Sequence, residues 1–276
     1  MNLLTAPHYS LFSVDFYRRV LRSGISQGIL YLLYLSALAT FLFLVFIMTR
    51  MAPQADAFVE WFKKELPPLV WTPEGLVMNA KNPYTMVHPA LGPVITFDTS
   101  KNDISVESMG EVTLYVTSKK VYAKQGTGDL RVYDLAQMMK ESKQPAAEKA
   151  LDPEAIGKFY QALKPWAIFF IGIAFFPFYF VWKFLAVLFY SGVGALINLS
   201  RTSRLPYSAI LNLSFFALTA SCLIQSIQLL VPGFDRVPFG WLGSVLVTSW
   251  YLFLAIKKTE GEGDSFSLPS ESSPLS

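Results

Sequence analysis

The chain of 276 residues is long enough for one large soluble domain, or for a smaller domain together with membrane spans. The composition favours the second arrangement, because 53% of the residues are hydrophobic and 16% are charged, whereas a soluble domain carries about 25% charged residues. The net charge is only +3 and the basic residues are scattered, so we expect no nucleic-acid partner.

The first long apolar run covers residues 28–48 and contains no charged side chain. About 20 such residues cross a hydrocarbon core of roughly 30 Å. Ala37-Leu38-Ala39 imitates a signal-peptide cleavage site, but the apolar run continues without a break to Met48. The run therefore predicts an uncleaved signal anchor, preceded by a cytoplasmic N-terminal segment, residues 1–27.

The segment from 51 to 164 has the mixed texture of a folded α+β domain inserted between two spans. Apolar side chains at helical spacing predict a short amphipathic helix that Pro67-Pro68 ends; they are Phe58, Trp61, Phe62 and Leu66. Strands are predicted where β-branched and aromatic residues lie between turn residues. These stretches are 69–71, 76–78, 94–97, 112–116, 121–123 and 130–133.

Alternation of apolar and polar residues along 112–116 predicts a half-buried sheet. A helix from Leu135 to about Lys143 should follow. Another should begin at Asp152, which can cap it with Pro153 in the first helical position, and run directly into the second span. A domain held at both ends by membrane helices can pass a shift into the bilayer; a rigid cap that only covers the bundle is the alternative.

The second span, residues 166–186, contains Pro177, which should kink the helix. We expect Lys183 to extend its ammonium group to the headgroups, and residues 187–199 to form an extension along the inner surface. A cytoplasmic loop, 200–207, precedes the third span.

The third span covers residues 208–231, an outer turn 232–238, and the fourth span 239–256. The tail, 257–276, is rich in Ser, Pro and Glu and is expected to be disordered. The fold class predicted is thus an α-helical integral membrane protein with about four transmembrane helices and an inserted extracytoplasmic α+β domain.

Orientation follows from the excess of Lys and Arg on the cytoplasmic side of short loops. Three basic clusters fall on one side of a four-span arrangement, which places both termini in the cytoplasm of a bacterial inner (plasma) membrane. These topology determinants are Arg18, Arg19, Arg22, Arg201, Arg204, Lys257 and Lys258.

Polar side chains are densest in the third span, where they form two stripes on a helical wheel. Two stripes suggest two neighbouring helices joined by interhelical hydrogen bonds; a polar substrate path is the alternative. Coupled transport usually needs an intramembrane acid or base, and no Asp, Glu or His occurs in any span. The candidate interhelical contacts are Asn212, Thr219, Ser221, Gln225 and Gln228.

Few residues suggest chemistry. Cys222, the single cysteine, falls in an apolar segment and cannot form an intramolecular disulfide. His8 and His88 lie on opposite sides of a predicted span, so they cannot share a metal site or a catalytic dyad. We therefore predict no catalytic residue, no metal and no cofactor, and a protein that is not an enzyme.

Four short patterns carry a resemblance to a known family: 16–20 (FYRRV), 71–76 (WTPEGL), 95–99 (ITFDT) and 204–207 (RLPY). With them the chain resembles the bacterial domain of unknown function 1189 family over nearly its whole length. That family is similar in hydropathy to Yip1-type membrane proteins, and some members are named for maltodextrin utilisation. The resemblance implies the membrane topology and supplies no catalytic or binding residues.

Two hypotheses follow. In the first, the chain is a non-enzymatic multi-pass membrane protein whose extracytoplasmic domain senses or binds a partner. Its partners would be the lipid bilayer and another membrane protein or a second copy of itself. In the second, the chain is an accessory subunit or permease for small-solute transport, which the family resemblance connects with maltodextrin.

Overall fold

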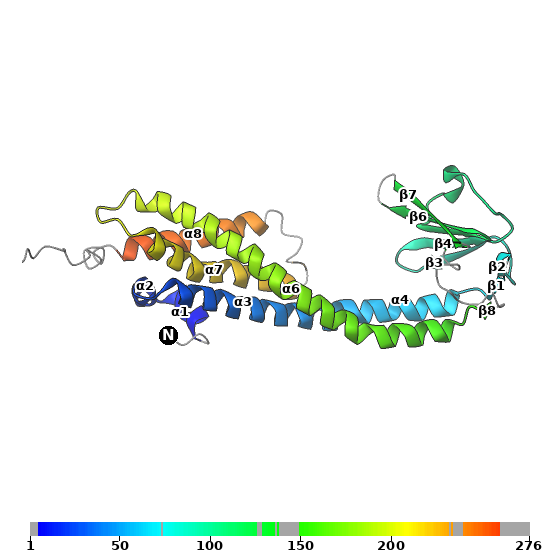
Figure 1. Ribbon diagram of the computed structural model, residues 1–276, viewed down its shortest axis with the longest axis horizontal. Helices are drawn as coiled ribbons and strands as arrows, with labels where there is room; N and C mark the ends of the chain where they lie inside the picture. The colour runs from blue at the N-terminus through cyan, green and yellow to red at the C-terminus, as the bar shows by residue number, and fades with distance from the viewer. Residues whose placement is uncertain are drawn as a thin grey trace, which may run out of the picture. The chain divides into compact units, whose positions relative to one another are not determined.

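The computed structural model describes residues 5–72, 74–125, 129–135, 137, 149–231, 233 and 240–259 (Figure 1). The chain divides into two compact units. Residues 1–51 and 166–276 form the first, here called the helical bundle, and residues 52–165 form the second, called the inserted domain. The predicted helix from 135 to 143, the outer turn and the tail beyond residue 259 fall mostly or wholly outside the described residues.

The described helices begin with two short ones of the bundle, α1 (Ala6–Phe12) and α2 (Val14–Leu21). Helix α3 (Ile25–Phe46) continues through a π-helical turn, Ile47–Met51, into α4 (Ala52–Glu65). The remaining helices are α6 (Pro153–Asn198), α7 (Tyr207–Leu230) and α8 (Gly240–Lys258).

Three of these helices are long and apolar enough to cross a membrane: Ile25–Glu65, Pro153–Asn198 and Tyr207–Leu230. They contain three of the four predicted spans as candidates, and that these helices cross the bilayer at the predicted bounds stays a prediction. The fourth predicted span coincides with α8, a helix of 19 residues, and its crossing of the bilayer stays a prediction. The predicted start of the second long helix is confirmed. Pro153 is its first residue, and Asp152 Oδ1 caps it by accepting a hydrogen bond from the Glu154 N–H at 2.9 Å.

Helix α7 forms the centre of the bundle, with α1, α2, α3 and α8 packed on it (Figure 1). Its residues 212–222 are all buried, including Phe215 and Phe216. In contrast, only 11% of the most apolar window of α6 is buried. The apolar surface of α6 is therefore the surface that suits lipid, while α7 is shielded by other helices.

Two expectations for the second span differ from the structure. Residues 187–198 continue the same 46-residue helix instead of starting a separate surface segment; the helix also runs through Pro177 without a break, and the expected kink there stays a prediction. Gly194 and Tyr190 pack against the bundle there, and this packing holds the segment in place. Lys183 does not reach the headgroups, because its side chain is only 2% exposed.

The N-terminal segment also differs from the expected plain cytoplasmic stretch. Helices α1 and α2 bury Phe16, Tyr17 and Val20 in the core that α7 forms. Phe16 packs edge-on against Phe216 at a ring distance of 5.4 Å. Helix α2 is short and carries charged residues, so its sequence does not predict a membrane span. Its apolar face nevertheless packs into the core of the bundle.

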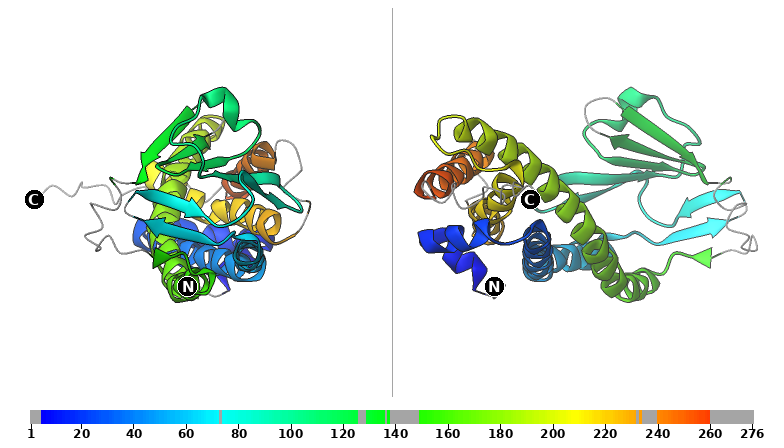
Figure 2. Two further views of the ribbon diagram at one scale, coloured as in Figure 1. Left: turned by 90° about the vertical axis from the view of Figure 1, so that its right-hand side faces the viewer. Right: turned by 60° about the vertical axis from the view of Figure 1, so that its left-hand side comes forward.

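The inserted domain contains two sheets (Figure 2). The smaller has the order β2-β1-β8, and all its pairs are antiparallel. The larger has the order β3-β4-β5-β6-β7, with β4 and β5 parallel and the other pairs antiparallel. The strands are β1 (Leu69–Thr72), β2 (Gly75–Met78), β3 (Tyr84–His88), β4 (Gly92–Asp98), β5 (Leu114–Thr117), β6 (Lys120–Gln125), β7 (Asp129–Asp134) and β8 (Lys149–Ala150).

Six strands were predicted from sequence and are confirmed; β3 and β8 were missed. The expectation of a half-buried sheet was wrong at β5, because both of its faces are covered. Val116 packs in one cluster with Met86 and Phe97. Tyr115 packs in another cluster, with Met109, Val112 and Tyr122 as its buried members. The alternation along this strand placed Tyr115 on the solvent side. In the structure Tyr115 instead belongs to a second, small hydrophobic core.

Asp103 makes a surface cluster with two residues of β6, accepting hydrogen bonds from Lys120 Nζ at 2.5 Å and from the Tyr122 hydroxyl. These hydrogen bonds lower the pKa of Asp103 from 3.8 to about 2, and the bond from Lys120 has the largest effect. The depressed pKa means that the ionised carboxylate stabilises the folded domain fully above pH 3.8 and that this contribution is lost as the pH falls toward 2.

Replacing Asp103 by Asn should therefore remove part of the loss of stability between pH 4 and pH 2. The urea midpoint of the full-length protein in detergent, followed by near-ultraviolet circular dichroism, checks this. E111Q is the matched control, since Glu111 is an exposed acid without an ion pair in the described part of the chain. Equal pH dependence in wild type and D103N would contradict the assignment.

Candidate functional site

One side of α7 holds the N-terminal helices by hydrogen bonds. The Asn212 amide donates to the carbonyl oxygens of Val20 and Ser23 at 2.8 and 2.9 Å. Thr219 accepts a bond from Ser10 at 3.0 Å and is bonded to the Tyr31 hydroxyl at 2.6 Å. These contacts cap the C-terminal carbonyls of α2 and join α1, α3 and α7.

The second side of α7 faces α6 and α8. Ser221 Oγ lies 3.1 Å from Ser244 Oγ of α8. Gln225 Oε1 accepts a bond from Lys183 Nζ of α6 at 2.7 Å. Gln228 is half-buried and makes no side-chain hydrogen bond with any residue that the structure describes. The two polar stripes of α7 thus meet two different groups of helices.

Lys183 is the most unusual group of the bundle. Besides Gln225, its ammonium reaches Ser221 Oγ at 3.4 Å and lies 5.2 Å from the centroid of the Tyr179 ring. Every one of these partners is neutral. The sequence has no Asp or Glu in α3, α7 or α8, and none in α6 after Glu154. A buried lysine in a membrane segment usually marks a functional site, and this one is held by dipoles and an aromatic ring alone.

Sequence reasoning missed Lys183 because it searched the spans for acids and histidines and assigned the lysine to the headgroups. A signal was present in the sequence. Ser221 and Gln225 are separated by four residues, so they lie on one helix face, and such a polar pair inside an apolar span needs a polar partner on a neighbouring helix. Lys183 is the lysine available in the second span for that role.

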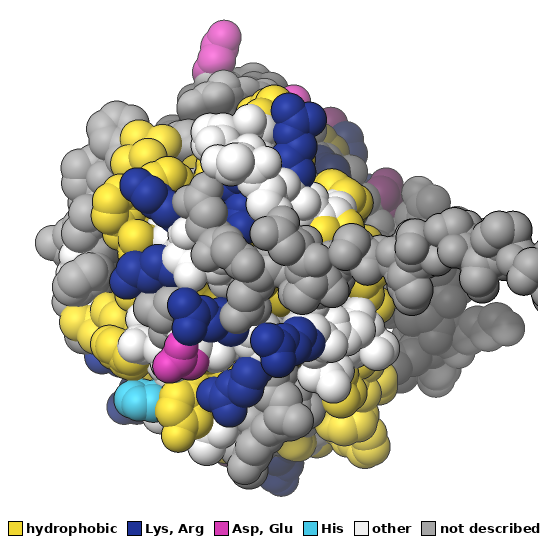
Figure 3. Space-filling model, turned by 90° about the vertical axis from the view of Figure 1, so that its left-hand side faces the viewer, with side chains coloured by type: hydrophobic (Ala, Val, Ile, Leu, Met, Phe, Trp, Pro, Cys, Tyr) yellow, Lys and Arg dark blue, Asp and Glu magenta, His cyan; other side chains and the backbone are white. Residues whose placement is uncertain are grey.

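The basic residues predicted to set the topology meet at one end of the bundle (Figure 3). Arg201, between α6 and α7, donates to the carbonyl oxygen of Ile256 and, at 3.1 Å, to that of Thr259, at the end of α8. Asn212 brings the start of α7 to the end of α2. Figure 3 shows dark-blue Lys and Arg side chains gathered on this face with little acidic surface among them.

Their individual environments differ. Arg201 is 7% exposed and caps the C-terminal carbonyls of α8. Arg18 pairs with Asp15 at 3.3 Å, and Lys257 lies over the Phe253 ring. The remaining topology determinants are exposed: Arg19, Arg22, Arg204 and Lys258.

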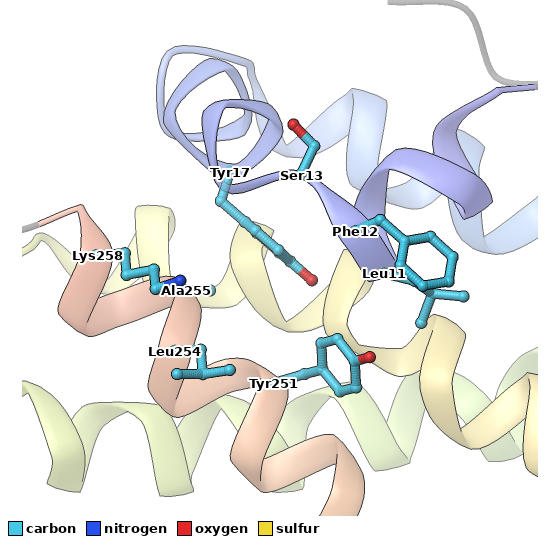
Figure 4. A pocket seen from close by; sticks show the side chains of 8 residues that line it. All are labelled: Leu11, Phe12, Ser13, Tyr17, Tyr251, Leu254, Ala255 and Lys258. Atoms are coloured by element: carbon cyan, nitrogen blue, oxygen red, sulfur yellow. The ribbon is translucent and has the colours of Figure 1, made fainter.

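A pocket of about 120 Å³ opens at the same end of the bundle (Figure 4). It lies between the junction of α1 and α2 and the last two turns of α8. In Figure 4 the Tyr17 ring reaches from α2 toward α8, and Lys258 borders the pocket on the α8 side. The lining residues are Leu11, Phe12, Ser13, Tyr17, Tyr251, Leu254, Ala255 and Lys258.

The two histidines lie in different units. His8 packs against Tyr9 and Phe12 in α1, and His88 packs edge-on against Trp61 at a ring distance of 4.7 Å. Among the described residues, no group of three or more His, Cys, Asp or Glu side chains could hold a metal ion.

Comparison with known families gives one match. The family described as "Protein of unknown function (DUF1189)" matches residues 8–256, so the chain belongs to that family. The family resemblance predicted from the four short patterns is thereby confirmed. Neither the curated proteins nor the solved structures contain a match to this chain.

Proposed function

We propose that this DUF1189 member is a non-enzymatic, multi-pass protein of the bacterial inner membrane whose inserted domain lies outside the cytoplasm and binds a partner there. The observation that carries the proposal is that both connections between the domain and the bundle are uninterrupted helices, Ile25–Glu65 and Pro153–Asn198. At roughly 1.5 Å per residue, the 46-residue helix is roughly 70 Å long, about twice a hydrocarbon core of roughly 30 Å.

The basic end of the bundle supports the orientation. Basic residues near span ends favour the cytoplasmic side, and all three clusters meet there. With α8 as a fourth span, both chain ends lie in the cytoplasm and the inserted domain lies opposite.

Ion pairs support the transmission of a shift along the helices. Within the inserted domain, Asp56 of α4 accepts bonds from Lys164 at 2.7 and 2.8 Å and from the Tyr160 hydroxyl at 2.9 Å. Lys63 of α4 lies 3.2 Å from Glu154. These bonds join α4 to the first turns of α6, so binding that moves one helix moves the other.

Site-specific photocrosslinking in intact cells tests the proposal. Val87 and Leu91 are 56% and 66% exposed apolar residues at the β3–β4 hairpin, and a crosslinker at either position should give one repeatable adduct with a membrane or periplasmic protein or with a second copy. Glu111, an exposed residue of the same domain, is the control position. A protein that stays without any adduct at every exposed position of the domain would contradict partner binding.

The alternative, an accessory subunit or permease for small solutes such as maltodextrin, is favoured by one observation, the buried Lys183. A buried lysine amine beside the polar side chains Ser221 and Gln225 of α7 can take part in binding an anionic or polar solute. K183M should then abolish uptake of the solute, while K257M, at the exposed end of α8, should leave uptake unchanged. Normal uptake by folded K183M would remove this function.

A further inference from the structure

The pocket at the basic end has a polar side and an apolar side. Lys258 and Ser13 supply an ammonium and a hydroxyl group, while Leu11, Phe12 and Leu254 supply apolar surface; the Tyr17 hydroxyl already donates to the Ser10 carbonyl oxygen at 2.6 Å. Lys258 is exposed and makes no hydrogen bond or ion pair with the residues that the structure describes. Phe12 is 75% exposed beside it. Such a pocket suits a ligand with a charged group and an apolar chain.

The size of the pocket limits the ligand. About 120 Å³ is well below the roughly 300–1,000 Å³ of sites that enclose drug-sized molecules. A single charged group fits, and the remainder of its molecule must lie outside the pocket along the bundle. Tyr251 lies two helical turns before Lys258, so the pocket extends about 10 Å along α8 from its basic end.

The surroundings determine the sign of the charge. Arg19 is exposed on α2 and Arg22 is exposed directly after it, and Lys257 precedes Lys258 on α8. Helix α2 contains one acidic residue, Asp15, and its carboxylate forms an ion pair with Arg18. A cluster of Lys and Arg where a membrane helix ends attracts anionic lipid headgroups, and an exposed apolar residue such as Phe12 can contact the acyl chains.

We propose that this pocket binds the phosphate of an anionic phospholipid, with Lys258 as the charged contact, Ser13 beside the headgroup, and Phe12 and Leu254 along the acyl chain. The lipid lies between the α1–α2 junction and α8 and holds them together. This binding is independent of what the inserted domain recognises.

Native mass spectrometry of the full-length protein in mild detergent tests the site. Phosphatidylglycerol and phosphatidylcholine are added in equal amounts, and inorganic phosphate is tested separately. Wild type should retain one phosphatidylglycerol in preference to phosphatidylcholine, and it should not retain inorganic phosphate. K258Q should reduce that retention about fivefold, the effect of one basic residue near a lipid surface.

Two further variants separate the pocket from general charge. S13F fills the pocket without changing charge and should also lose the lipid. R204Q removes one exposed charge at the same end but does not line the pocket, and it should retain the lipid as wild type does. Equal losses in K258Q and R204Q, retention by S13F, or equal binding of the two lipids would each overturn the proposal, as would retention of inorganic phosphate.

Discussion

Replacing Gly194 by alanine should destabilise the bundle. The same change at Gly192, two residues earlier on α6, should not. A methyl group on Gly194 would lie 2.6 Å from Cγ2 of Ile210 and 3.2 Å from Cδ2 of Leu252. Ile210 is 2% exposed and Leu252 is fully buried, and the Ile210 side chain has one strongly preferred χ1 rotamer in a helix, which opposes rotation of its methyl group away from Gly194. Overpacking of this kind lowers the free energy of unfolding by about 1–3 kcal/mol.

A methyl group on Gly192 would meet nothing within 4 Å. Because alanine is favoured over glycine inside a helix by roughly 0.5–1 kcal/mol, G192A should be neutral or slightly stabilising. Unfolding in increasing sodium dodecyl sulfate, followed by tryptophan fluorescence, measures both variants. Equal effects would mean that residues 187–198 lie away from α7 and α8, as the sequence prediction of a surface extension had it.

The second large effect concerns Lys183. Replacing Gln225 by leucine removes the 2.7 Å acceptor of the buried ammonium and leaves Ser221, at 3.4 Å, as its remaining hydrogen-bond partner. A buried donor without its acceptor costs roughly 1–3 kcal/mol, and more when it is charged. Q225L should therefore be clearly less stable than wild type.

The double variant K183M/Q225L should recover most of that loss, since replacing both partners of a buried pair by apolar groups can be nearly neutral. Measuring both single variants and the double variant in the same detergent completes a double-mutant cycle. Additive effects, with the double variant least stable, would show that Lys183 and Gln225 are not coupled.

Most of the helical architecture could be predicted from sequence because lipid demands long uncharged segments, and these are visible in a single chain. The runs 28–48 and 166–186 lie within the candidate spans Ile25–Glu65 and Pro153–Asn198, and the run 208–231 coincides with α7 except for its last residue. Helix ends were less predictable. The π-helical turn at Ile47–Met51 joins α3 to α4 at a point where the change in hydropathy suggested a boundary.

Contacts between distant residues were not predictable in the same way. Asn212 and Thr219 stood out as polar residues in a span, but their partners, Val20 and Ser10, lie in short helices that give no strong signal. Strand β8 has two residues and pairs with β1 far along the chain. Such features depend on which surfaces meet after folding, and neither periodicity nor composition records that.

The central proposal is that the apolar helices cross a bilayer and that the inserted domain lies on the side of the membrane opposite to the basic residues. Cysteine labelling tests it most directly, because Cys222 is the one native cysteine and is buried. In a C222S background, a membrane-impermeant maleimide should label E111C in intact spheroplasts and should label S200C only after the membrane is opened. Labelling of S200C in intact spheroplasts, with E111C protected until lysis, would contradict the account.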